Sequence, residues 1–401
     1  MRAEWAKSSV PAANEAVGVS AVDTGSGTSV HDAVVVGAGP AGASAALRLA
    51  RAGLDTLLVE RAEWPRDKVC GCCLHPSGVD ELEALDASVG PDALGARRLA
   101  RARIRARGRD LVVPTPGAVA LSRTRLDTAL VDAAIGAGVN FQQRTRAVLA
   151  PSVESSTRTL TLRRGAEEST VRTRIVLAAD GLGGSLLAKG DQVHSRVEAR
   201  ARVGLGARLA ADAVEIADDE VELHVAPHGY AGLVRLEDGS IDLAAAVDPE
   251  SLARMGPEEC IAAVFEAARS RLPAGLDSAR WQGTASLSRR PPQAASRRAF
   301  ALGDAAGYVE PFTGEGITWA LVGGRLAAQA AIAEREGWED AAMARWERDR
   351  DRELETRRRR CRAVSRAVRR PRLVSALAGP AARFEFFAAI LGRVGYGPPR
   401  R

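Results

Sequence analysis

Three glycines near the start of the chain have the spacing of a turn that binds a phosphate group. They are Gly37, Gly39 and Gly42, and Pro40 and Ala41 stand between them. In such a turn the first glycine permits a tight bend, the second lets the backbone approach a pyrophosphate, and the third lets a helix pack against a strand. The pyrophosphate then lies at the amino end of the helix, where unpaired N–H groups favour an anion.

An acidic residue follows this turn at a distance that suits a contact with ribose. Glu60 closes a short apolar segment, eighteen residues after Gly42, and a carboxylate there accepts hydrogen bonds from an adenosine ribose. The glycines alone are weak evidence, because a glycine-rich turn without a nucleotide is the simpler explanation. Together with Glu60 and the strand, helix and strand around them they predict a bound dinucleotide. They do not separate FAD from NAD.

A second glycine-rich stretch lies near the other end of the chain. Gly303 and Asp304 follow an apolar segment, and Gly314, Gly316 and Ile317 come shortly afterwards. Taken alone, the Gly303-Asp304 pair would be an ordinary tight turn. Together with the first glycine turn, the stretch resembles the second flavin signature of the FAD-dependent oxidoreductase superfamily that contains aromatic hydroxylases and geranylgeranyl reductases.

The resemblance implies that the cofactor is FAD, with Asp304 on the ribityl chain and the backbone from Gly314 to Ile317 facing the flavin pyrimidine ring. Reduced flavin carries negative charge near N1 and O2, which the N–H groups at the start of a helix stabilise. Arg123 and Asp180 match two weaker elements, although each alone would be a surface ion pair or a turn. The predicted cofactor-binding residues are Gly37, Gly39, Pro40, Ala41, Gly42, Glu60, Arg61, Arg123, Asp180, Gly303, Asp304, Gly314, Gly316 and Ile317.

The loop after Glu60 carries three cysteines close together, Cys70, Cys72 and Cys73. It resembles the loop of geranylgeranyl reductase relatives in which a cysteine is followed by glycines, two of which Cys72 and Cys73 replace here. Three interpretations stay open: apolar packing beside the flavin, a redox-active or nucleophilic thiol, and a metal site that includes His75. The spacing does not resemble paired Cys-x-x-Cys ligands, so we assign no metal. Cys72 and His75 are the catalytic candidates, and Cys70 and Cys73 are substrate-side candidates.

The substrate side departs from the pattern of the superfamily's reductases. Their Tyr-x-Trp-x-Phe-Pro element corresponds here to the segment from Tyr230 to Arg235, with Gly232 in place of Trp. Tyr230 is a further substrate-side candidate, and the departure predicts a ligand other than a long isoprenoid. We expect a geranylgeranyl-reductase-like enzyme acting on a hydrophobic small molecule. The alternatives are a monooxygenase that hydroxylates an aromatic or polyketide-like substrate with NAD(P)H and O2, and a non-catalytic flavin-binding sensor.

The surrounding elements predict a doubly wound, glutathione-reductase-like α/β domain of the Rossmann type. An apolar run over residues 33–36, a helix over 40–52 and a strand over 56–60 form its opening. We expect this FAD domain to cover residues 31–192 and 298–335, with insertions. Alternating segments over 193–297 predict a mainly antiparallel sheet that forms a substrate domain. No second dinucleotide fold is evident, so NAD(P)H would bind only transiently as an electron donor.

The two ends of the chain differ from this body in composition. Residues 1–30 are rich in Ala, Ser and Gly without periodicity, and we expect them to be disordered. Residues 341–401 hold seventeen Arg and six acidic residues, a balance of +11, which leaves −5 for the rest of the chain. We expect a basic C-terminal helical tail over 336–401. It would either lie on an anionic membrane surface or be solvated and packed on the body.

Composition also limits the partners and the location. Aromatic residues make up 4% of the chain and no recognition module is visible, so nucleic acid is not an expected partner. The first residues lack a signal-peptide pattern, and no apolar run approaches membrane-spanning length. We therefore expect a cytoplasmic protein, with peripheral membrane contact through the tail as the alternative. The sequence does not predict an oligomeric state.

Overall fold

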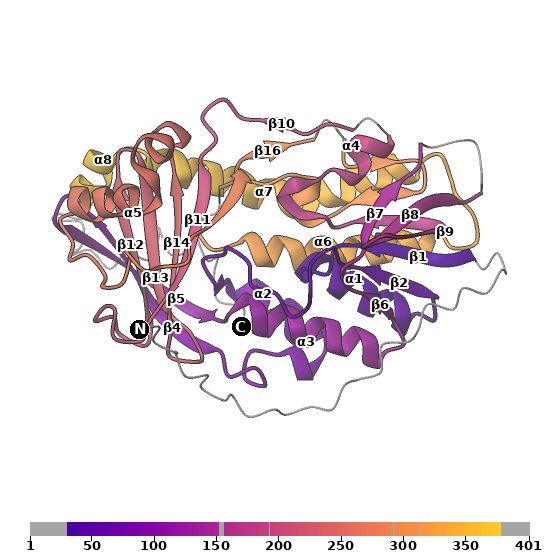
Figure 1. Ribbon diagram of the computed structural model, residues 1–401, viewed down its shortest axis with the longest axis horizontal. Coiled ribbons are helices and arrows are strands. Elements are labelled where there is room, and N and C mark those ends of the chain that lie inside the picture. The colour runs from indigo at the N-terminus through magenta and orange to yellow at the C-terminus, as the bar shows by residue number, and fades with distance from the viewer. Residues whose placement is uncertain (1–29, 152–155, 192, 292, 311, 378–401) are drawn as a thin grey trace, which may run out of the picture.

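The computed structural model describes residues 30–151, 156–191, 193–291, 293–310 and 312–377. Two eight-stranded sheets lie at opposite ends of an elongated molecule, and helices α6 and α7 run between them (Figure 1). The disorder expected for residues 1–30 concerns residues outside this description, except for Val30, which begins the first strand.

The first sheet has the strand order β17-β18-β9-β1-β2-β6, with β8 and β7 attached to β9. Its parallel centre confirms the predicted doubly wound domain, because β1 pairs in parallel with both β2 and β9. Its strands are β1 (Val30–Val36), β2 (Thr56–Val59), β6 (Asn140–Gln142), β7 (Arg146–Leu149), β8 (Arg158–Arg164), β9 (Glu167–Ala178), β17 (Ala295–Ser296) and β18 (Ala299–Ala301).

Successive residues of β1 face two different cores, as the alternation of side chains along a strand requires. Ala33 and Val35 pack with helices α1 (Pro40–Arg51), α3 (Arg123–Gly136) and α6 (Gly316–Ala333). Val34 and Val36 pack with β7, β8 and the short helix α4 (Leu186–Gly190).

Helices α1 and α6 approach each other closely at Gly324. A Cβ atom there would lie 2.3 Å from Ser44 Oγ and 2.6 Å from the carbonyl oxygen of Ala41, so a larger residue would push the helices apart. Because α1 begins after the first glycine turn and α6 follows the second glycine-rich stretch, this contact brings the two stretches together.

The second sheet has the order β15-β11-β14-β13-β12-β4-β5-β3 and is antiparallel except for the β12–β4 pair. This confirms the predicted mainly antiparallel sheet, and helix α5 (Pro249–Ala268) covers one of its faces. Its strands are β3 (Cys73–Leu74), β4 (Arg97–Ala106), β5 (Arg109–Ala120), β11 (Val203–Leu209), β12 (Glu220–Ala226), β13 (Gly229–Arg235), β14 (Ile241–Val247) and β15 (Gln282–Ser286).

Strands β3, β4 and β5 lie far before residue 193 in the chain, so residues 193–297 supply only part of this sheet. The division into 31–192, 298–335 and 193–297 stays a prediction. The remaining short elements are α2 (Pro76–Leu85), the paired strands β10 (Arg196–Val197) and β16 (Arg289–Arg290), and the 3-10 turns η1 (Ala87–Val89), η2 (Gly181–Gly183) and η3 (Gly303–Ala306).

The basic tail forms helices α7 (Ala342–Val368) and α8 (Pro371–Leu377) over its described residues. α7 packs on α6 and β17, and α8 packs on α7, β4 and β5. The side chains that α7 buries recur at intervals of three or four residues, which places them on one face of the helix: Ala342, Trp346, Arg350, Leu354, Arg358, Cys361, Ser365 and Val368.

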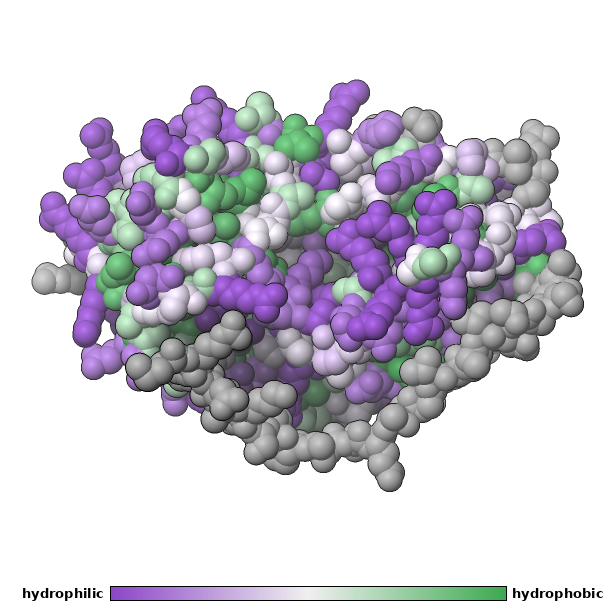
Figure 2. Space-filling view, in the orientation of Figure 1, coloured by the Kyte–Doolittle hydropathy of each residue, from purple (hydrophilic) through white to green (hydrophobic). Residues whose placement is uncertain are grey.

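The molecular face drawn in Figure 2 is mostly hydrophilic, with hydrophobic residues in small separated patches. None of the helices within the described ranges has both the length and the apolar character needed to cross a bilayer.

Candidate active site

The backbone of the first glycine turn leaves no room for a side chain at two of its glycines. Gly37 has a φ of +106°, and a Cβ atom on it would lie 2.3 Å from the carbonyl oxygen of Ala179. A Cβ atom on Gly42 would lie 1.9 Å from the carbonyl oxygen of Gly37. Glu60 is buried at the end of β2 and accepts hydrogen bonds from the backbone N–H groups of Ala38, at 3.1 Å, and Ala62, at 2.9 Å.

A cavity of about 490 Å³ adjoins this turn, and the predicted residues Gly37, Glu60, Arg61 and Asp180 line it. Asp180 also has a structural role, since its carboxylate accepts hydrogen bonds from the backbone N–H groups of Ser185 and Leu186 at 2.7 and 2.9 Å. The cavity therefore places the predicted ribose contact Glu60 and the first glycine turn together with two further predicted cofactor-binding residues, Arg61 and Asp180.

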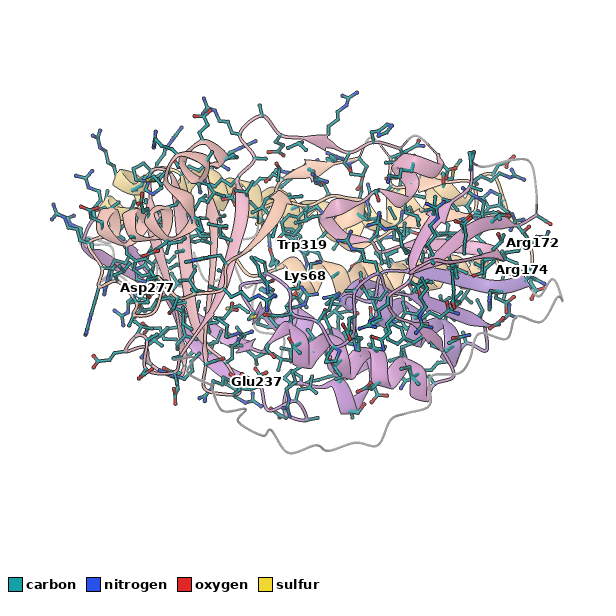
Figure 3. All side chains as sticks on the ribbon, in the orientation of Figure 1. Lys68, Arg172, Arg174, Glu237, Asp277 and Trp319 are labelled. Carbon is teal, nitrogen blue, oxygen red and sulfur yellow. The ribbon has the colours of Figure 1, made fainter. Side chains whose placement is uncertain are left out.

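Three cationic side chains surround the position at which α1 begins. A Cβ atom on Gly39 would lie 3.6 Å from both Arg123 Nη2 and Arg66 Nη2, and one on Gly181 would lie 3.3 Å from Lys68 Nζ. Lys68 lies between the two ends of the molecule (Figure 3). Burial, and then the charge of Arg123, lower the pKa of Lys68. A bound anion would offset both effects, as a pyrophosphate at a helix amino end would.

The sequence analysis did not include Arg66 or Lys68 among the cofactor-binding residues. Single arginines carry little information in so arginine-rich a chain, but lysine is rare in it: the chain holds Lys7, Lys68 and Lys189. A lysine eight residues after Glu60 was therefore a usable signal. Arg66 and Arg123 both contact the buried carboxylate of Asp127, at 3.2 and 2.7 Å, and this fixes the two guanidinium groups.

The second glycine-rich stretch borders another cavity, of about 200 Å³, on the face of the second sheet opposite α5. Gly303 and Gly314 have φ angles of +60° and +71°, values that favour glycine. Asp304, Gly314, Gly316 and Ile317 line the cavity, together with Pro40 and Ala41 from α1. The amino end of α6 thus faces the cavity.

The two cavities share the lining residues Gly39, Lys68, Val69, Ala179, Gly181, Leu182 and Thr284. They form one extended site with a carboxylate at one end, cations in the middle and the amino end of a helix at the other. This order suits the ribose, pyrophosphate and flavin of FAD, so the residues present fit that cofactor.

The cysteine loop lies against this second cavity, and Cys70, Cys72 and Cys73 all line it. Cys72 has a φ of +51°, which is the left-handed backbone conformation that glycine adopts most easily. Glycine would suit this position, and the small side chain of Cys72 is accommodated there as well. The Cys72 N–H donates to Cys70 Sγ at 3.4 Å, and Leu121 N–H donates to the carbonyl oxygen of Cys72 at 2.9 Å.

The three thiols differ in their acidity. A hydrogen bond from Cys72, followed by the charge of Arg123, lowers the pKa of Cys70 to about 6. The same hydrogen bond and burial raise the pKa of Cys72, and burial raises that of Cys73. Cys70 therefore has the thiolate character that nucleophilic or redox chemistry requires.

His75, the other catalytic candidate, lies at the start of α2. Its Nδ1 accepts a hydrogen bond from Ser77 N–H at 3.2 Å and lies 2.8 Å from Ser77 Oγ, so it caps the helix. His75 is not among the residues that line the cavity. Within the described ranges, no group of three or more His, Cys, Asp and Glu side chains has the arrangement of a metal site.

Aromatic and small side chains form the rest of the cavity wall. Tyr230 packs edge-on against Phe312 with ring centroids 4.9 Å apart, and Tyr308 lines the same cavity. Sequence reasoning found Tyr230 but missed Phe312 and Tyr308, although both flank the second glycine-rich stretch. Small residues from neighbouring strands complete the wall: Ala102, Gly204, Gly232, Ala244 and Ala246.

A buried carboxylic acid lies near the cysteine loop, and no sequence pattern singled it out. Asp242 on β14 is 8% exposed, and its Oδ2 has no hydrogen-bond partner among the described residues. Arg208 on the neighbouring strand β11 lies 3.9 Å from its Oδ1. Burial raises the pKa of Asp242 to about 8, even though Arg208 acts in the opposite direction.

Comparisons with known proteins agree with this geometry. The model of the FAD binding domain family matches residues 30–350. Menaquinone reductase of Mycolicibacterium smegmatis is 30% identical over 325 residues, which make up 74% of this chain and 75% of that protein. Digeranylgeranylglycerophospholipid reductase of Methanosphaerula palustris is 29% identical over 315 residues, 75% of this chain and 76% of that protein.

Among solved structures, a geranylgeranyl bacteriochlorophyll reductase-like protein from Thermoplasma acidophilum superimposes with a TM-score of 0.74, over 93% of this chain and 98% of that chain. Its sequence identity of 20% makes this a likeness of fold.

Proposed function

Since the chain belongs to the FAD binding domain family and is an FAD-dependent oxidoreductase, we propose that it reduces a carbon–carbon double bond in a hydrophobic small molecule. The observation that carries the proposal is the cavity beside Cys70, which places a largely apolar space between the amino end of α6 and the second sheet. Bound FAD supplies a hydride to a substrate in this space.

The residues of the chain supply the other requirements of such a reaction. Backbone N–H groups at the start of α6 favour negative charge on the reduced ring. Apolar side chains exclude water, which protects a hydride donor from side reactions. Arg66, Lys68 and Arg123, which lie beside Gly39 and Gly181, would hold the pyrophosphate of bound FAD.

We further propose that the substrate joins a flat ring to an unsaturated apolar chain. Gly232 takes the place of the bulky Trp of the reductase element, and together with Ala244 and Ala246 it gives the sheet side of the cavity small lining residues. The aromatic side chains of Tyr230, Tyr308 and Phe312 provide surfaces on which a ring can pack. The named substrate of the menaquinone reductase relative has this general shape.

The test uses the purified FAD-loaded enzyme, reduced anaerobically with dithionite or NAD(P)H and then mixed with menaquinone in detergent. We expect substrate-dependent reoxidation of the flavin and, by mass spectrometry after the quinone ring has been reoxidised in air, a product that keeps two added hydrogens, because hydroquinone formation alone would be reversed by that step. In a parallel experiment in which the reduced enzyme is mixed with substrate and O2, a product that gains oxygen would indicate the monooxygenase alternative. A purified protein with no bound or bindable flavin in its visible spectrum would contradict the assignment of the site.

A further inference from the structure

A buried pair of opposite charges lies behind the aromatic wall of the cavity. Arg202, directly before β11, and Glu310, shortly after Asp304, are each 1% exposed. Arg202 Nη1 donates a hydrogen bond to Glu310 Oε1 at 3.3 Å. Neither residue lines the cavity, and neither has a part in cofactor binding as described above.

Arg202 reaches the cavity wall through Tyr230. Its guanidinium carbon lies 5.8 Å from the centroid of the Tyr230 ring, within the range of a cation–π interaction. Tyr230 on β13 lines the cavity and packs edge-on against Phe312, with 4.9 Å between the ring centroids. The Tyr230 ring is therefore contacted by a buried cation and by a second aromatic side chain.

Glu310 connects these two contacts of Tyr230. Its carboxylate binds Arg202, and its carbonyl oxygen accepts a hydrogen bond from Phe312 N–H at 3.2 Å. Tyr230, Arg202, Glu310 and Phe312 thus form a closed cycle of contacts. This cycle joins the second sheet to the chain segment that carries the second glycine-rich stretch.

Further contacts fix the charged pair itself. Arg202 Nε donates to Asp248 Oδ1 at 3.0 Å, and Arg369 Nη2 donates to Glu310 Oε2 at 2.8 Å. Burial raises the pKa of Glu310, while Arg202 and Arg369 act in the opposite direction and favour the charged carboxylate. A buried ion pair gains little stability over well-packed apolar side chains. Its clearest effect here is geometric, because each partner contacts one aromatic residue of the wall.

From these contacts, we propose that Arg202 and Glu310 are positioning residues that orient Tyr230 and Phe312 for the ring of the substrate. The inference rests on the proposed function, in which a flat ring packs on the aromatic side chains of the cavity. Side chains that must be ordered during binding lower the affinity, so a wall that is already held in place binds a ring more tightly. Loss of the pair should therefore weaken substrate binding and leave the chemical step unchanged.

The first test observes Tyr230 directly by fluorine NMR. The chain holds three tyrosines, so FAD-loaded protein labelled with fluorotyrosine gives few signals, and Tyr230→Phe identifies the one from Tyr230. We expect Arg202→Met to shift or broaden this signal because the ring loses its cation. Arg202→Lys should change it less, because a cation remains near the ring. Menaquinone in detergent should shift the wild-type signal even without turnover.

The second test measures the kinetics of menaquinone reduction. We expect Arg202→Met to raise KM about tenfold, the most that one aromatic contact usually contributes to binding. The value of kcat should change by less than about twofold, which is the pattern of lost binding rather than lost chemistry.

Arg158→Met is the matched control for both tests. Arg158 is 3% exposed and pairs with Asp191 at 2.9 Å, so it is also a buried arginine in an ion pair. It lies on β8 and lines neither cavity. Arg158→Met should lose stability as Arg202→Met does, but it should keep the wild-type KM and the wild-type Tyr230 signal.

Glu310→Gln guards against misfolding of Arg202→Met, since the amide keeps the shape of the carboxyl and removes its charge. We expect it to change the Tyr230 signal and KM in the same direction as Arg202→Met, but less. If both variants keep the wild-type signal or the wild-type KM, the positioning role is wrong. Equal changes in Arg158→Met would assign the effects to general destabilisation and would also overturn it.

The outcomes separate the two proposals. A wild-type enzyme that reduces no double bond contradicts the proposed function, while the Tyr230 signal still reports on the charged pair. If menaquinone leaves the wild-type Tyr230 signal in place, Tyr230 does not contact the ring and the positioning proposal is wrong, even for an active enzyme.

Discussion

At the scale of single residues, the glycines of the first turn are needed because neighbouring backbone atoms leave no space for a side chain, and not because the turn has to be flexible. We expect Gly42→Ala to lose FAD, because its methyl group would lie 1.9 Å from the Gly37 carbonyl oxygen and the turn would have to move. The cost in unfolding free energy should be about 3 kcal/mol, at the upper end of the usual range for overpacking. Flavin absorbance per protein and thermal unfolding measure the two effects.

Gly136→Ala is the matched control, since a Cβ atom there would meet nothing within 4 Å. Gly136 lies inside α3, so alanine should leave stability unchanged or raise it by up to about 1 kcal/mol. Full FAD content in Gly42→Ala would show that the turn does not need its third glycine.

Cys70 should be the most reactive of the three clustered thiols. Its pKa is lowered to about 6, so it is largely thiolate at neutral pH and becomes protonated as the pH falls below that value. We expect iodoacetamide at pH 7 to alkylate Cys70 before Cys72 and Cys73, whose pKa values are raised. Peptide mass spectrometry over a pH series measures this order. Equal labelling of all three would contradict it.

The same experiment on Cys72→Gly tests the cause of the acidity. The hydrogen bond from Cys72 is the largest contribution to the low pKa of Cys70, so its removal should raise that pKa and slow alkylation at pH 7. Cys361, whose pKa burial raises to about 11, serves as an internal reference. An unchanged pH profile for Cys70 would assign the effect to Arg123 instead.

At the scale of elements, α7 holds the segment that forms the flavin end of the cavity. Arg358 Nη2 donates to the Gly307 carbonyl oxygen at 3.1 Å, and Ser365 Oγ donates to the Glu310 carbonyl oxygen at 2.8 Å. Arg369 Nη2 lies 2.8 Å from the Glu310 carboxylate. Arg358 and Ser365 lie about two turns apart on α7 and Arg369 directly follows the helix, so one side of α7 reaches residues 307–310, shortly after Asp304.

We expect Arg358→Leu to destabilise the protein by about 2 kcal/mol, because it leaves the buried Gly307 carbonyl without its donor. FAD should also dissociate faster, since Gly307 ends the turn that carries Asp304. Arg359→Leu is the matched control: its side chain is 76% exposed and only pairs with Glu355, so it should change stability by less than about 0.5 kcal/mol. Equal effects of the two variants would contradict a positioning role for α7.

Elements with strong local patterns were predictable and their partners were not. The strands Val203–Leu209 and Ile241–Val247 occur where apolar alternation predicted them. The packing of α7 depends on contacts with residues about fifty positions away, and its buried face includes Arg350 and Arg358. A sequence pattern assigns arginines to solvent, so both interpretations of the tail left out its role in the site.

At the scale of the whole molecule, the cofactor was predictable because both FAD signatures carry their own backbone requirements. The substrate wall was not, because the second sheet assembles strands from residues 73–120 and 203–286. Asp242 on β14 and the cysteine loop before β3 come to the same sheet only through this assembly. Local periodicity contains no information on such pairings, which depend on the complete fold.

The described part of the tail also bears on the predicted membrane contact. Positive charge on α7 and directly after it is used inside the molecule, as at Arg358 and Arg369. Helix α8 differs, since Leu373 and Leu377 lie one turn apart and are 42% and 36% exposed. Arg370 and Arg372 are exposed beside them. Membrane contact, if it supplies a hydrophobic substrate, should therefore occur through α8 rather than α7.

We expect the full-length protein to sediment with anionic vesicles at low salt and to be released at high salt, because attraction to anionic lipids is screened. Changing both Leu373 and Leu377 to Gln should weaken binding at least about tenfold, since each buried leucine contributes about 2 kcal/mol. The control changes Val197 and Leu272, which are 48% and 46% exposed elsewhere, to Gln and should bind as the wild type does. Wild-type protein that stays in the supernatant at low salt would rule out the contact, and its hydrophobic substrate would then have to reach the cavity from solution or from a carrier.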